Sequence, residues 1–439
     1  MTGRNMALPK VSKWTLLIPL VLVLLIGLGW AVTQRGEEAG AERFDLPRIP
    51  WEGGPAYYAG HRAAAAAGWT DPGFFPIGVW FESVIDERDV RLDKEAGLNT
   101  YVELTGNSDA ELIRKHGMHA ITAKPLDGAG RETVGWLITD EPDMFAGPGD
   151  GVWSGKFPGE GKPCIPDKPP CGYTAMRTLK DKLPKNDGRF HYANFGKGVA
   201  MWETDEEARR FVNSYTDVMS TDIYWHTDAN ICDEAEHFLQ LPPDRCRRAA
   251  NYGRTVERGR RLDALDGRLQ PVYAFVEVGW PGANGSRAIT GEQIAGAVMN
   301  ALIHEARGVV YFNHSFGGPC ISQHVLREPC TKDVRAAVTE LNRRITSLAP
   351  VLNTQSYAHT FEPRLDTMLK AHDGSFYVFA TVGEEAGPGS YTLRLPPGLT
   401  SASGKAEVLF ENRTVPLRGG AITDTFERLD SYHVYRITP

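Results

Sequence analysis

The sequence lacks the motifs that mark nucleotide-binding and nucleic-acid-binding proteins. It has no Gly-x-x-x-x-Gly-Lys-Ser/Thr phosphate loop, and no Gly-x-Gly-x-x-Gly follows a strand-like run. The 439 residues carry a mild net charge of −7 and contain no basic block. Nucleic acid is therefore not an expected partner, and the sequence implies no cofactor.

Closely spaced thiol pairs of the Cys-x-x-Cys type are also absent, which argues against a zinc site. The six cysteines instead form three sequential pairs, and an even number of cysteines in an exported chain indicates disulfides. Nearest-neighbour pairing is the favoured connectivity. It predicts the disulfides Cys164–Cys171, Cys232–Cys246 and Cys320–Cys330.

Charged residues are missing from one long apolar segment, residues 14–32. A helix of this length would span the ~30 Å hydrocarbon core of a bilayer. Basic residues precede the segment, and Glu37 and Glu38 follow it, which places the N-terminus inside and the remainder outside. We expect a single-pass anchor in the cell membrane. A cleaved signal peptide, which would give a secreted protein, is the alternative.

Apolar strand-like runs recur eight times along the middle of the chain. They cover residues 75–81, 98–104, 118–123, 134–141, 190–195, 217–225, 272–278 and 308–314. Most are continuously apolar, as expected for strands that are covered on both faces. Helical patterns separate them, with Asp86 as an N-cap and a capping box that begins at Thr204. This alternation predicts an α/β fold, a closed (β/α)8 TIM-type barrel over residues 51–349, with an open doubly wound sheet as the alternative.

The flanking segments differ in character from the barrel. Residues 1–33 are predicted to form a cytoplasmic stub with the anchor (or a signal peptide), and residues 34–50 a polar linker. After residue 350, short β-prone runs are separated by Gly- and Pro-rich turns. Residues 350–439 are therefore predicted to form a small antiparallel β-sandwich. We expect the protein to be a monomer.

The functional residues of such a barrel lie at the C-terminal ends of its strands. The predicted strand ends of this chain are rich in carboxylates, amides, histidines and aromatic rings. These side chains are Trp80, Glu103, Asp140, Glu141, Asn194, Asp222, Tyr224, Trp225, Glu277, Trp280 and His314. The three cysteine pairs fall in the loops after the fourth, sixth and eighth strands, so they would brace loops over the same face.

Two glutamates, Glu141 and Glu277, end the fourth and seventh predicted strands. Glycoside hydrolysis needs two carboxyl groups that flank the anomeric carbon. The arrangement, together with a first strand that begins in the Phe75-Pro76 run, resembles the retaining (β/α)8-barrel glycoside hydrolases. The resemblance implies that Glu141 is the acid/base, that Glu277 is the nucleophile, and that Tyr224 supports the nucleophile.

One residue departs from that family, in which an asparagine usually precedes the acid/base. Here the residue is Asp140, and an Asp-Glu pair followed by Pro142 is similar to the hexosaminidase-type barrels. In those enzymes the substrate assists its own hydrolysis. That second resemblance implies that Asp140 orients an acetamido group, that Glu141 is the acid, and that Glu277 is a binding residue.

The remaining strand-end residues are predicted to bind the sugar, and the alternative is a purely structural role in the core or in holding loops. Flat aromatic faces stack on sugar C–H groups, a role expected for Trp80, Trp225 and Trp280, whereas Glu103, Asn194, Asp222 and His314 would hydrogen-bond to the substrate. The sequence thus predicts an extracytoplasmic glycoside hydrolase that cleaves a poly- or oligosaccharide, such as a cell-wall glycan, by retaining double displacement. The alternatives are a substrate-assisted hydrolase, a transglycosylase and a non-catalytic glycan-binding barrel.

Overall fold

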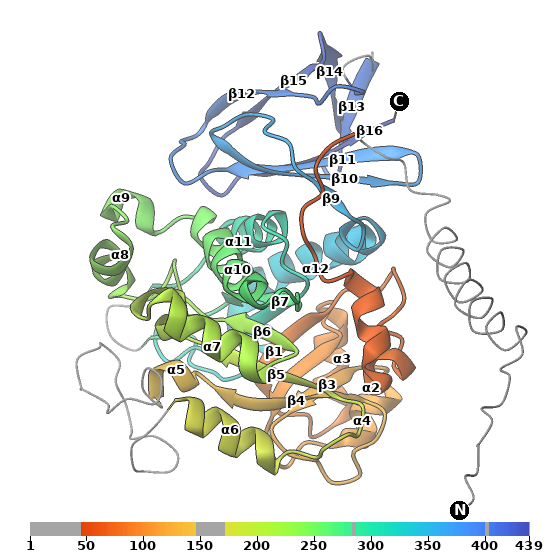
Figure 1. Cartoon of the computed structure of the whole chain (residues 1–439), viewed down its shortest axis with the longest axis vertical. Coiled ribbons are helices and arrows are strands. Elements are labelled where there is room, and N and C mark those ends of the chain that lie inside the picture. Colours follow the sequence, from red (N-terminus) through yellow and green to blue (C-terminus); the bar gives the residue numbers. More distant parts are fainter. Residues whose placement is uncertain (1–44, 146–171, 283–286, 400–403, 439) are drawn as a thin grey trace, which may run out of the picture. The chain divides into compact units, whose positions relative to one another are not determined.

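Eight parallel strands close into a barrel in the computed structural model, which describes residues 45–145, 172–282, 287–399 and 404–438 (Figure 1). The strands are β1 Ile77–Glu82, β2 Thr100–Leu104, β3 His119–Thr122, β4 Thr133–Asp140, β5 Phe190–Phe195, β6 Val218–Thr221, β7 Val272–Glu277 and β8 Val309–Phe312. β1 pairs with both β2 and β8, so the sheet has no free edge. The predicted barrel is confirmed.

Most helices connect the strands and cover the outside of the barrel, whereas the first one precedes β1 and contributes Ala64 to the interior cluster. They are α2 Arg62–Ala66, α3 Glu87–Glu95, α4 Ala110–Lys115, α5 Pro142–Phe145, α6 Tyr173–Lys182, α7 Asp205–Tyr215, α8 Ile231–Leu239, α9 Pro243–Cys246, α10 Ala250–Asp263, α11 Gly291–Ile303 and α12 Lys332–Leu352. The Asp86 side chain caps α3, and Thr204 and Glu207 form the capping box of α7. Both caps were predicted from the sequence, because their side chains satisfy amides that the first helical turn leaves unpaired.

The buried side chains form two layers on either side of the barrel wall. The interior of the barrel is filled by a cluster that includes Trp80, Phe190 and Tyr273. A larger cluster lies between the strands and the helices. A strand that contributes to both layers is apolar on both faces, which is why the sequence shows continuous apolar runs.

The C-terminal strands form one antiparallel sheet. They are β9 Ser356–Tyr357, β10 Leu365–His372, β11 Ser375–Val382, β12 Gly389–Arg394, β13 Gly404–Val408, β14 Arg413–Arg418, β15 Ala421–Phe426 and β16 Tyr432–Ile437. Their order is β12-β15-β14-β13-β16-β11-β10-β9. The predicted antiparallel domain is present, but the two separate sheets of a sandwich are not, because β13 pairs with β16 and joins the two halves. The sheet curls, since the rings of Phe426 on β15 and His433 on β16 are 4.6 Å apart.

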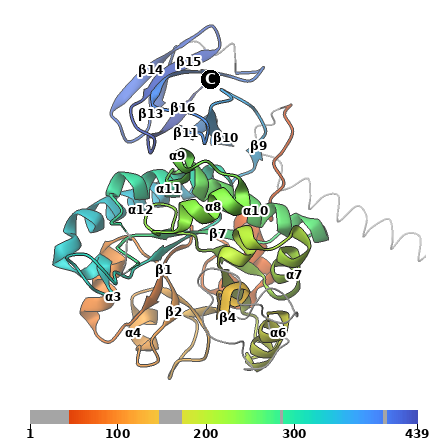
Figure 2. The same ribbon diagram turned by 90° about the vertical axis from the view of Figure 1, so that its left-hand side faces the viewer.

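The C-terminal sheet lies over α11 and α12 (Figure 2), and barrel and sheet share a hydrophobic core. The buried side chains of Met368, Tyr377 and Phe379 belong to the same cluster as those of α11 and α12. Asn300 of α11 also donates hydrogen bonds of 2.8 Å to Asp366 and to Thr381. Residues Leu46–Pro439 form one compact unit.

Two of the predicted disulfides are confirmed. Cys232–Cys246 and Cys320–Cys330 are both bonded, whereas Cys164–Cys171 lies outside the described residues. The predicted anchor, residues 14–32, also lies outside them. Within the described ranges, no helix has the length and apolar character needed to cross a membrane.

Candidate active site at the barrel mouth

Three residues at the C-terminal ends of barrel strands have backbone angles that side chains rarely adopt. Phe81, Glu103 and Glu141 have φ values of 52°, 61° and 43°. This left-handed conformation is sterically costly for residues other than glycine. Such strain persists where the surrounding structure enforces it, and it is concentrated at functional sites. Three of the nine non-glycine residues with positive φ in the described ranges thus lie at this mouth of the barrel.

A group of acidic side chains occupies the mouth beside β4, β5 and β6. The carboxyl groups of Glu141 and Asp222 lie close enough to influence one another's ionisation. The Tyr224 hydroxyl donates to Asp222 Oδ2 over 3.0 Å. Asn194 Nδ2 donates to Asp140 Oδ1 over 2.9 Å. Five of the predicted site residues are thus brought together by three neighbouring strands.

The pKa values of Glu141 and Asp222 are both raised. Burial raises the pKa of Glu141 to about 8, and the negative charges of Asp140 and Asp143 add to the effect. Burial, followed by the charges of Glu141 and Asp140, raises the pKa of Asp222 well above its ordinary value. Two adjacent carboxyl groups in such surroundings hold a proton between them near neutral pH. The pair is therefore equipped to donate a proton.

Solvent access decides which carboxyl group of this pair can reach a ligand. Asp222 is buried, Glu141 is partly exposed and Asp140 is exposed. Burial among the surrounding residues, with the charges of Asp143 and Glu103, raises the pKa of Asp140, and the hydrogen bond from Asn194 opposes the rise. Because Asp140 reaches water, we expect solvent to moderate this shift. Of the pair, Glu141 is therefore the group that a ligand at the mouth could reach, with Asp140 beside it.

Two further charged side chains support this centre, and neither was predicted from the sequence as a site residue. Asp143 is buried and accepts hydrogen bonds from the backbone amides of Gly196 over 3.0 Å and Val199 over 2.7 Å. Lys197 lies close enough to Glu141 for its positive charge to oppose the rise in pKa. The run Asp140-Glu141-Pro142-Asp143 offered a signal for Asp143, but nothing in the sequence marks Lys197.

Glu277 has a different environment from Glu141. Its side chain is fully buried. The Tyr252 hydroxyl of α10 lies 2.8 Å from both carboxylate oxygens, and Oε1 also accepts from the His226 amide over 3.1 Å and from Thr227 Oγ1 over 3.3 Å. The structure therefore encloses Glu277 between β7, α10 and the loop after β6, with partners distinct from those of Glu141.

The support expected from Tyr224 is corrected accordingly. Its hydroxyl contacts Asp222 and not Glu277, and Tyr252 provides the phenolic hydrogen bond to Glu277. The contact of Tyr252 with Glu277 was not predicted, because Tyr252 lies on a helix outside the barrel wall. Nothing in the sequence indicates which residues of such a helix contact the end of a strand. Burial raises the pKa of Glu277 to about 7, and these hydrogen bonds oppose the rise.

The structure also corrects two of the three tryptophans predicted to stack on sugar. Trp80 is 6% exposed and packs its edge against Phe275 inside the barrel, with ring centroids 5.5 Å apart. Trp225 is 1% exposed and donates from Nε1 to Thr255 Oγ1 over 3.0 Å. Neither presents a ring face to solvent. Trp280 is partly exposed and lies beside the glycine turn at Gly317 and Gly318.

The last two predicted residues lie at the mouth and are held by backbone groups. Glu103 is partly exposed and accepts a hydrogen bond from the Ala123 amide over 2.9 Å. His314 is buried, and its Nε2 lies 3.2 Å from the carbonyl oxygen of Phe81. Glu103 is close enough to raise the pKa of Asp140. Within the described ranges, no group of three or more His, Cys, Asp and Glu side chains is arranged to hold a metal ion.

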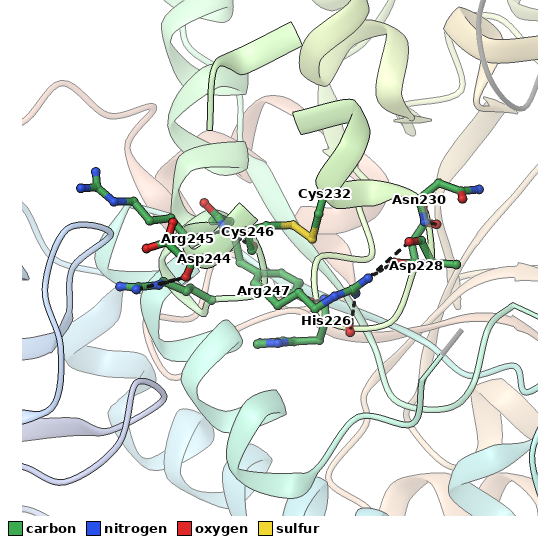
Figure 3. Close-up of a disulfide and its surroundings, with 12 residues drawn as sticks. His226, Asp228, Asn230, Cys232, Asp244, Arg245, Cys246 and Arg247 are labelled. Carbon is green, nitrogen blue, oxygen red and sulfur yellow. Dashed lines mark hydrogen bonds between the residues drawn. A yellow bond between two sulfur atoms is a disulfide. The ribbon is translucent and has the colours of Figure 1, made fainter. Parts of the chain in front are cut away.

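The Cys232–Cys246 disulfide joins α8 to α9 beside the site (Figure 3). Arg247 fixes the preceding loop by donating to the carbonyl oxygens of His226 over 2.9 Å and Asp228 over 2.7 Å. The same segment carries both acidic partners of Lys197, whose Nζ lies 2.7 Å from Asp228 and 2.8 Å from Glu234. The disulfide thus restrains the segment that positions the cation near Glu141.

We expect the double variant C232A/C246A to lose about 3 kcal/mol of unfolding free energy, because the disulfide closes a short loop and restricts the unfolded chain. Urea unfolding measures the change. The matched comparison is C320A/C330A, which opens a loop of similar length after β8 and should lose a similar amount. Unchanged unfolding of C232A/C246A would contradict the expectation.

A cavity of about 980 Å³ lies away from the barrel mouth, between α11, α12 and the C-terminal sheet. Two of the arginines that line it are paired with acidic residues of the same lining. Arg413 binds Glu411 and Asp424, and Arg344 binds Glu340. The positive charges of these arginines are already balanced by neighbouring carboxylates. The cavity is therefore a weaker candidate for a catalytic site than the acidic group at the mouth.

No family profile and no curated protein matches the chain in sequence. Three solved structures illustrate the similarity in fold. A maltogenic α-amylase, AmyB from Thermotoga neapolitana, is 9% identical with a TM-score of 0.47, over 82% of this chain and 98% of that one. AmyP in complex with maltose is 9% identical with a TM-score of 0.45, over 84% and 98%. A GH30 endoxylanase from Clostridium papyrosolvens C71 is 9% identical with a TM-score of 0.44, over 83% and 97%.

Proposed function

We propose that the protein is a glycoside hydrolase in which Glu141 donates the proton to the leaving-group oxygen. The observation that carries the proposal is the position of Glu141 at the barrel mouth, partly exposed and close to the buried carboxyl group of Asp222. A general acid must be protonated at the working pH. The burial and like charges around Glu141 provide that condition, and its partial exposure gives it access to a substrate.

The burial of Glu277 favours a substrate-assisted mechanism. Both oxygens of Glu277 are held by Tyr252 in a fully buried site, whereas Asp140 is exposed next to Glu141. In the substrate-assisted route, the carbonyl oxygen of a 2-acetamido group attacks the anomeric carbon, so the protein needs no nucleophile of its own. A carboxylate is needed only to accept the amide N–H and orient the group. Asp140, exposed beside Glu141, is the carboxylate proposed for this role.

The proposed reaction has two steps, formation of a cyclic intermediate and its hydrolysis. In the first, the acetamido oxygen bonds to the anomeric carbon, the glycosidic bond breaks, and Glu141 gives its proton to the departing oxygen. In the second, Glu141 takes a proton from water as the water oxygen attacks the anomeric carbon and the cyclic intermediate opens. The anomeric configuration is retained, because each step inverts it once. Retention is common to this route and to double displacement by Glu277, which is the competing proposal.

The proposed substrate is therefore a glycan that contains 2-acetamido sugars, outside the cytoplasm. The two disulfides support this location, since such bonds persist in oxidising compartments. The charge asymmetry around the proposed anchor at residues 14–32 gives the same orientation. A cell-wall glycan fits both the location and the sugar class.

A matched pair of 4-nitrophenyl glycosides tests the mechanism. We expect the 2-acetamido glycoside to be cleaved with a kcat/KM on the order of 10²-fold or more above that of its 2-hydroxy counterpart, because only the former carries the internal nucleophile. A thiazoline that mimics the cyclised acetamido group should inhibit competitively. Equal rates, with a 2-fluoro sugar trapped on Glu277 in the mass spectrum, would establish double displacement instead. If neither substrate class is cleaved but glycan still binds, the protein is a non-catalytic glycan-binding barrel and not a hydrolase.

A further inference from the structure

We infer that a row of rings leading from the proposed catalytic centre to the β1–β8 side of the mouth binds further sugar units of the substrate chain. We name this row the aromatic track. It consists of Tyr224, Phe312, His314, Phe316 and Phe81. The inference rests on the proposed function and deepens it, because it specifies an oligosaccharide and not a single capped sugar.

The rings of the track are in contact one after another. The centroids of Tyr224 and Phe312 are 4.9 Å apart, and those of Phe312 and His314 are also 4.9 Å apart. From His314 the track divides toward Phe316, at 5.8 Å, and Phe81, at 5.9 Å. Its inner end is anchored to the centre, since the Tyr224 hydroxyl donates to Asp222. The track therefore connects the acidic group to the surface without a gap.

The outer end of the track is exposed to solvent. Phe81 is 37% exposed and Phe316 is 45% exposed, and the neighbouring segments expose Ile85 and Ile321. Of the large hydrophobic side chains that are exposed in the described part of the chain, only Leu265 is not on the β1 or β8 loops. Single exposed apolar residues are ordinary, but a group of them at one place marks a binding surface.

The backbone is strained so that Phe81 points outward. In the pairing of β1 with β2, Trp80 faces Val102 and Glu82 faces Leu104, so that Phe81 has no partner in the register. Its φ of 52° turns the ring to the surface while Glu82 is fully buried. The inward turn of Glu82 is stabilised by His324 Nδ1 at 2.5 Å. A conformation that costs free energy and exposes an aromatic ring has no benefit for packing.

The loop that carries Phe316 is also fixed before any ligand arrives. The Phe316 amide donates to the Trp280 carbonyl oxygen over 2.9 Å. Ser315 and Ser322 exchange backbone hydrogen bonds of 2.7 and 3.1 Å. The Cys320–Cys330 disulfide closes the same loop. A preformed platform loses little conformational entropy when it binds.

The chemistry of the track selects the ligand. Its exposed rings are phenyl groups without charge or hydrogen-bonding groups. Such faces match the apolar C–H faces of pyranose rings, and they have no charge or hydrogen-bonding group with which to bind an ionic group. The track therefore suits neutral sugar units that continue beyond the one held at Glu141.

The test compares a long substrate with a short one in F81A, F316A and the double variant. The probes are the β-1,4-linked hexamer of N-acetylglucosamine and 4-nitrophenyl N-acetyl-β-glucosaminide. We expect the ratio of their kcat/KM values to fall about tenfold in each single variant, because a stacked ring buries apolar area that only the hexamer can cover. F316W should keep the ratio near that of the wild type, and L265A, an exposed apolar residue off the track, should leave it unchanged.

A binding measurement separates this inference from the proposed function. Calorimetric titration of the hexamer into E141Q should give a Kd that rises about tenfold when F316A is added. If the wild type cleaves neither probe but hexamer binding weakens in F316A, the proposed function fails and the track stands. If cleavage is normal and the ratio is unchanged in the double variant, or if the hexamer neither binds nor reacts, the track is overturned. F316A, in an exposed loop position, carries the test should F81A fail to fold.

Discussion

Replacing Glu141 with glutamine is expected to lower kcat for an unactivated glycoside by about 10³-fold, with little change in KM. The amide cannot protonate the leaving oxygen, and a positioned general acid contributes roughly 10²–10⁴-fold. A substrate with a strongly acidic leaving group, such as a glycosyl fluoride, needs no proton and should lose far less. Steady-state kinetics on the two substrates measure the difference. E236Q, which changes an exposed glutamate on α8, is the matched control.

The same residue should set the alkaline limit of activity. Because burial and neighbouring charges raise the pKa of Glu141 to about 8, the protonated form persists at neutral pH and is lost above that value. Wild-type kcat/KM should therefore fall as the pH rises through this range, and E141Q should lack that fall. Since Glu141 and Asp222 titrate together, the apparent pKa of this alkaline limit describes the two carboxyl groups jointly and not Glu141 alone. An identical loss on both leaving groups in E141Q would show that Glu141 is not the acid.

Replacing Glu277 with glutamine is expected to preserve most of the turnover and to stabilise the protein at alkaline pH. Burial raises the pKa of Glu277 to about 7 in the folded state, against about 4.3 in an unfolded chain. Between these values the folded state binds more protons than the unfolded state. The wild type therefore loses stability as the pH rises through this window, by up to ~3 kcal/mol. Glutamine does not titrate, so the loss disappears.

Urea unfolding of the wild type and E277Q at pH 5 and pH 8 measures this change. The advantage of E277Q over the wild type should grow between the two values. Y252F serves as the companion variant, because it removes the hydrogen bond that lowers the pKa of Glu277 and should steepen the loss of stability. A fall in turnover of about 10⁴-fold with unchanged unfolding would restore Glu277 as the nucleophile of a double displacement.

The elements of the barrel could be predicted because each is encoded locally. Continuous apolar runs of strand length, bounded by caps such as Asp86, specify strands that are covered on both faces. The convergence of Asp140, Glu141 and Asp222 was also predictable, since the C-terminal ends of parallel strands meet at one edge of the barrel. No knowledge of side-chain direction was needed for either prediction.

The direction of individual side chains could not be predicted. An apolar strand shows no alternation from which to tell inside from outside, so nothing in the sequence shows that Trp80 fills the barrel interior. The left-handed angles of Phe81, Glu103 and Glu141 also break the regular alternation at the strand ends. The enclosure of Glu277 depends on Tyr252, a contact between helix and strand that has no local signature.

The C-terminal sheet shows the same limit. β14 and β15 were not predicted, because their apolar residues are few and charged residues or Pro416 interrupt them. Their strand character comes from pairing with neighbours, β14 with β13 and β15 with β14. Tertiary pairing of this kind overrides weak local preference.

The core shared by α11, α12 and the C-terminal sheet limits how this protein can be truncated. Because Tyr377 and Phe379 complete a cluster that begins in the barrel, ending the chain after α12 would leave an apolar wall of the barrel facing water. The sheet is thus not a detachable module that could be exchanged without harm. Barrel and sheet are parts of one cooperative folding unit, and soluble fragments of this protein should retain both.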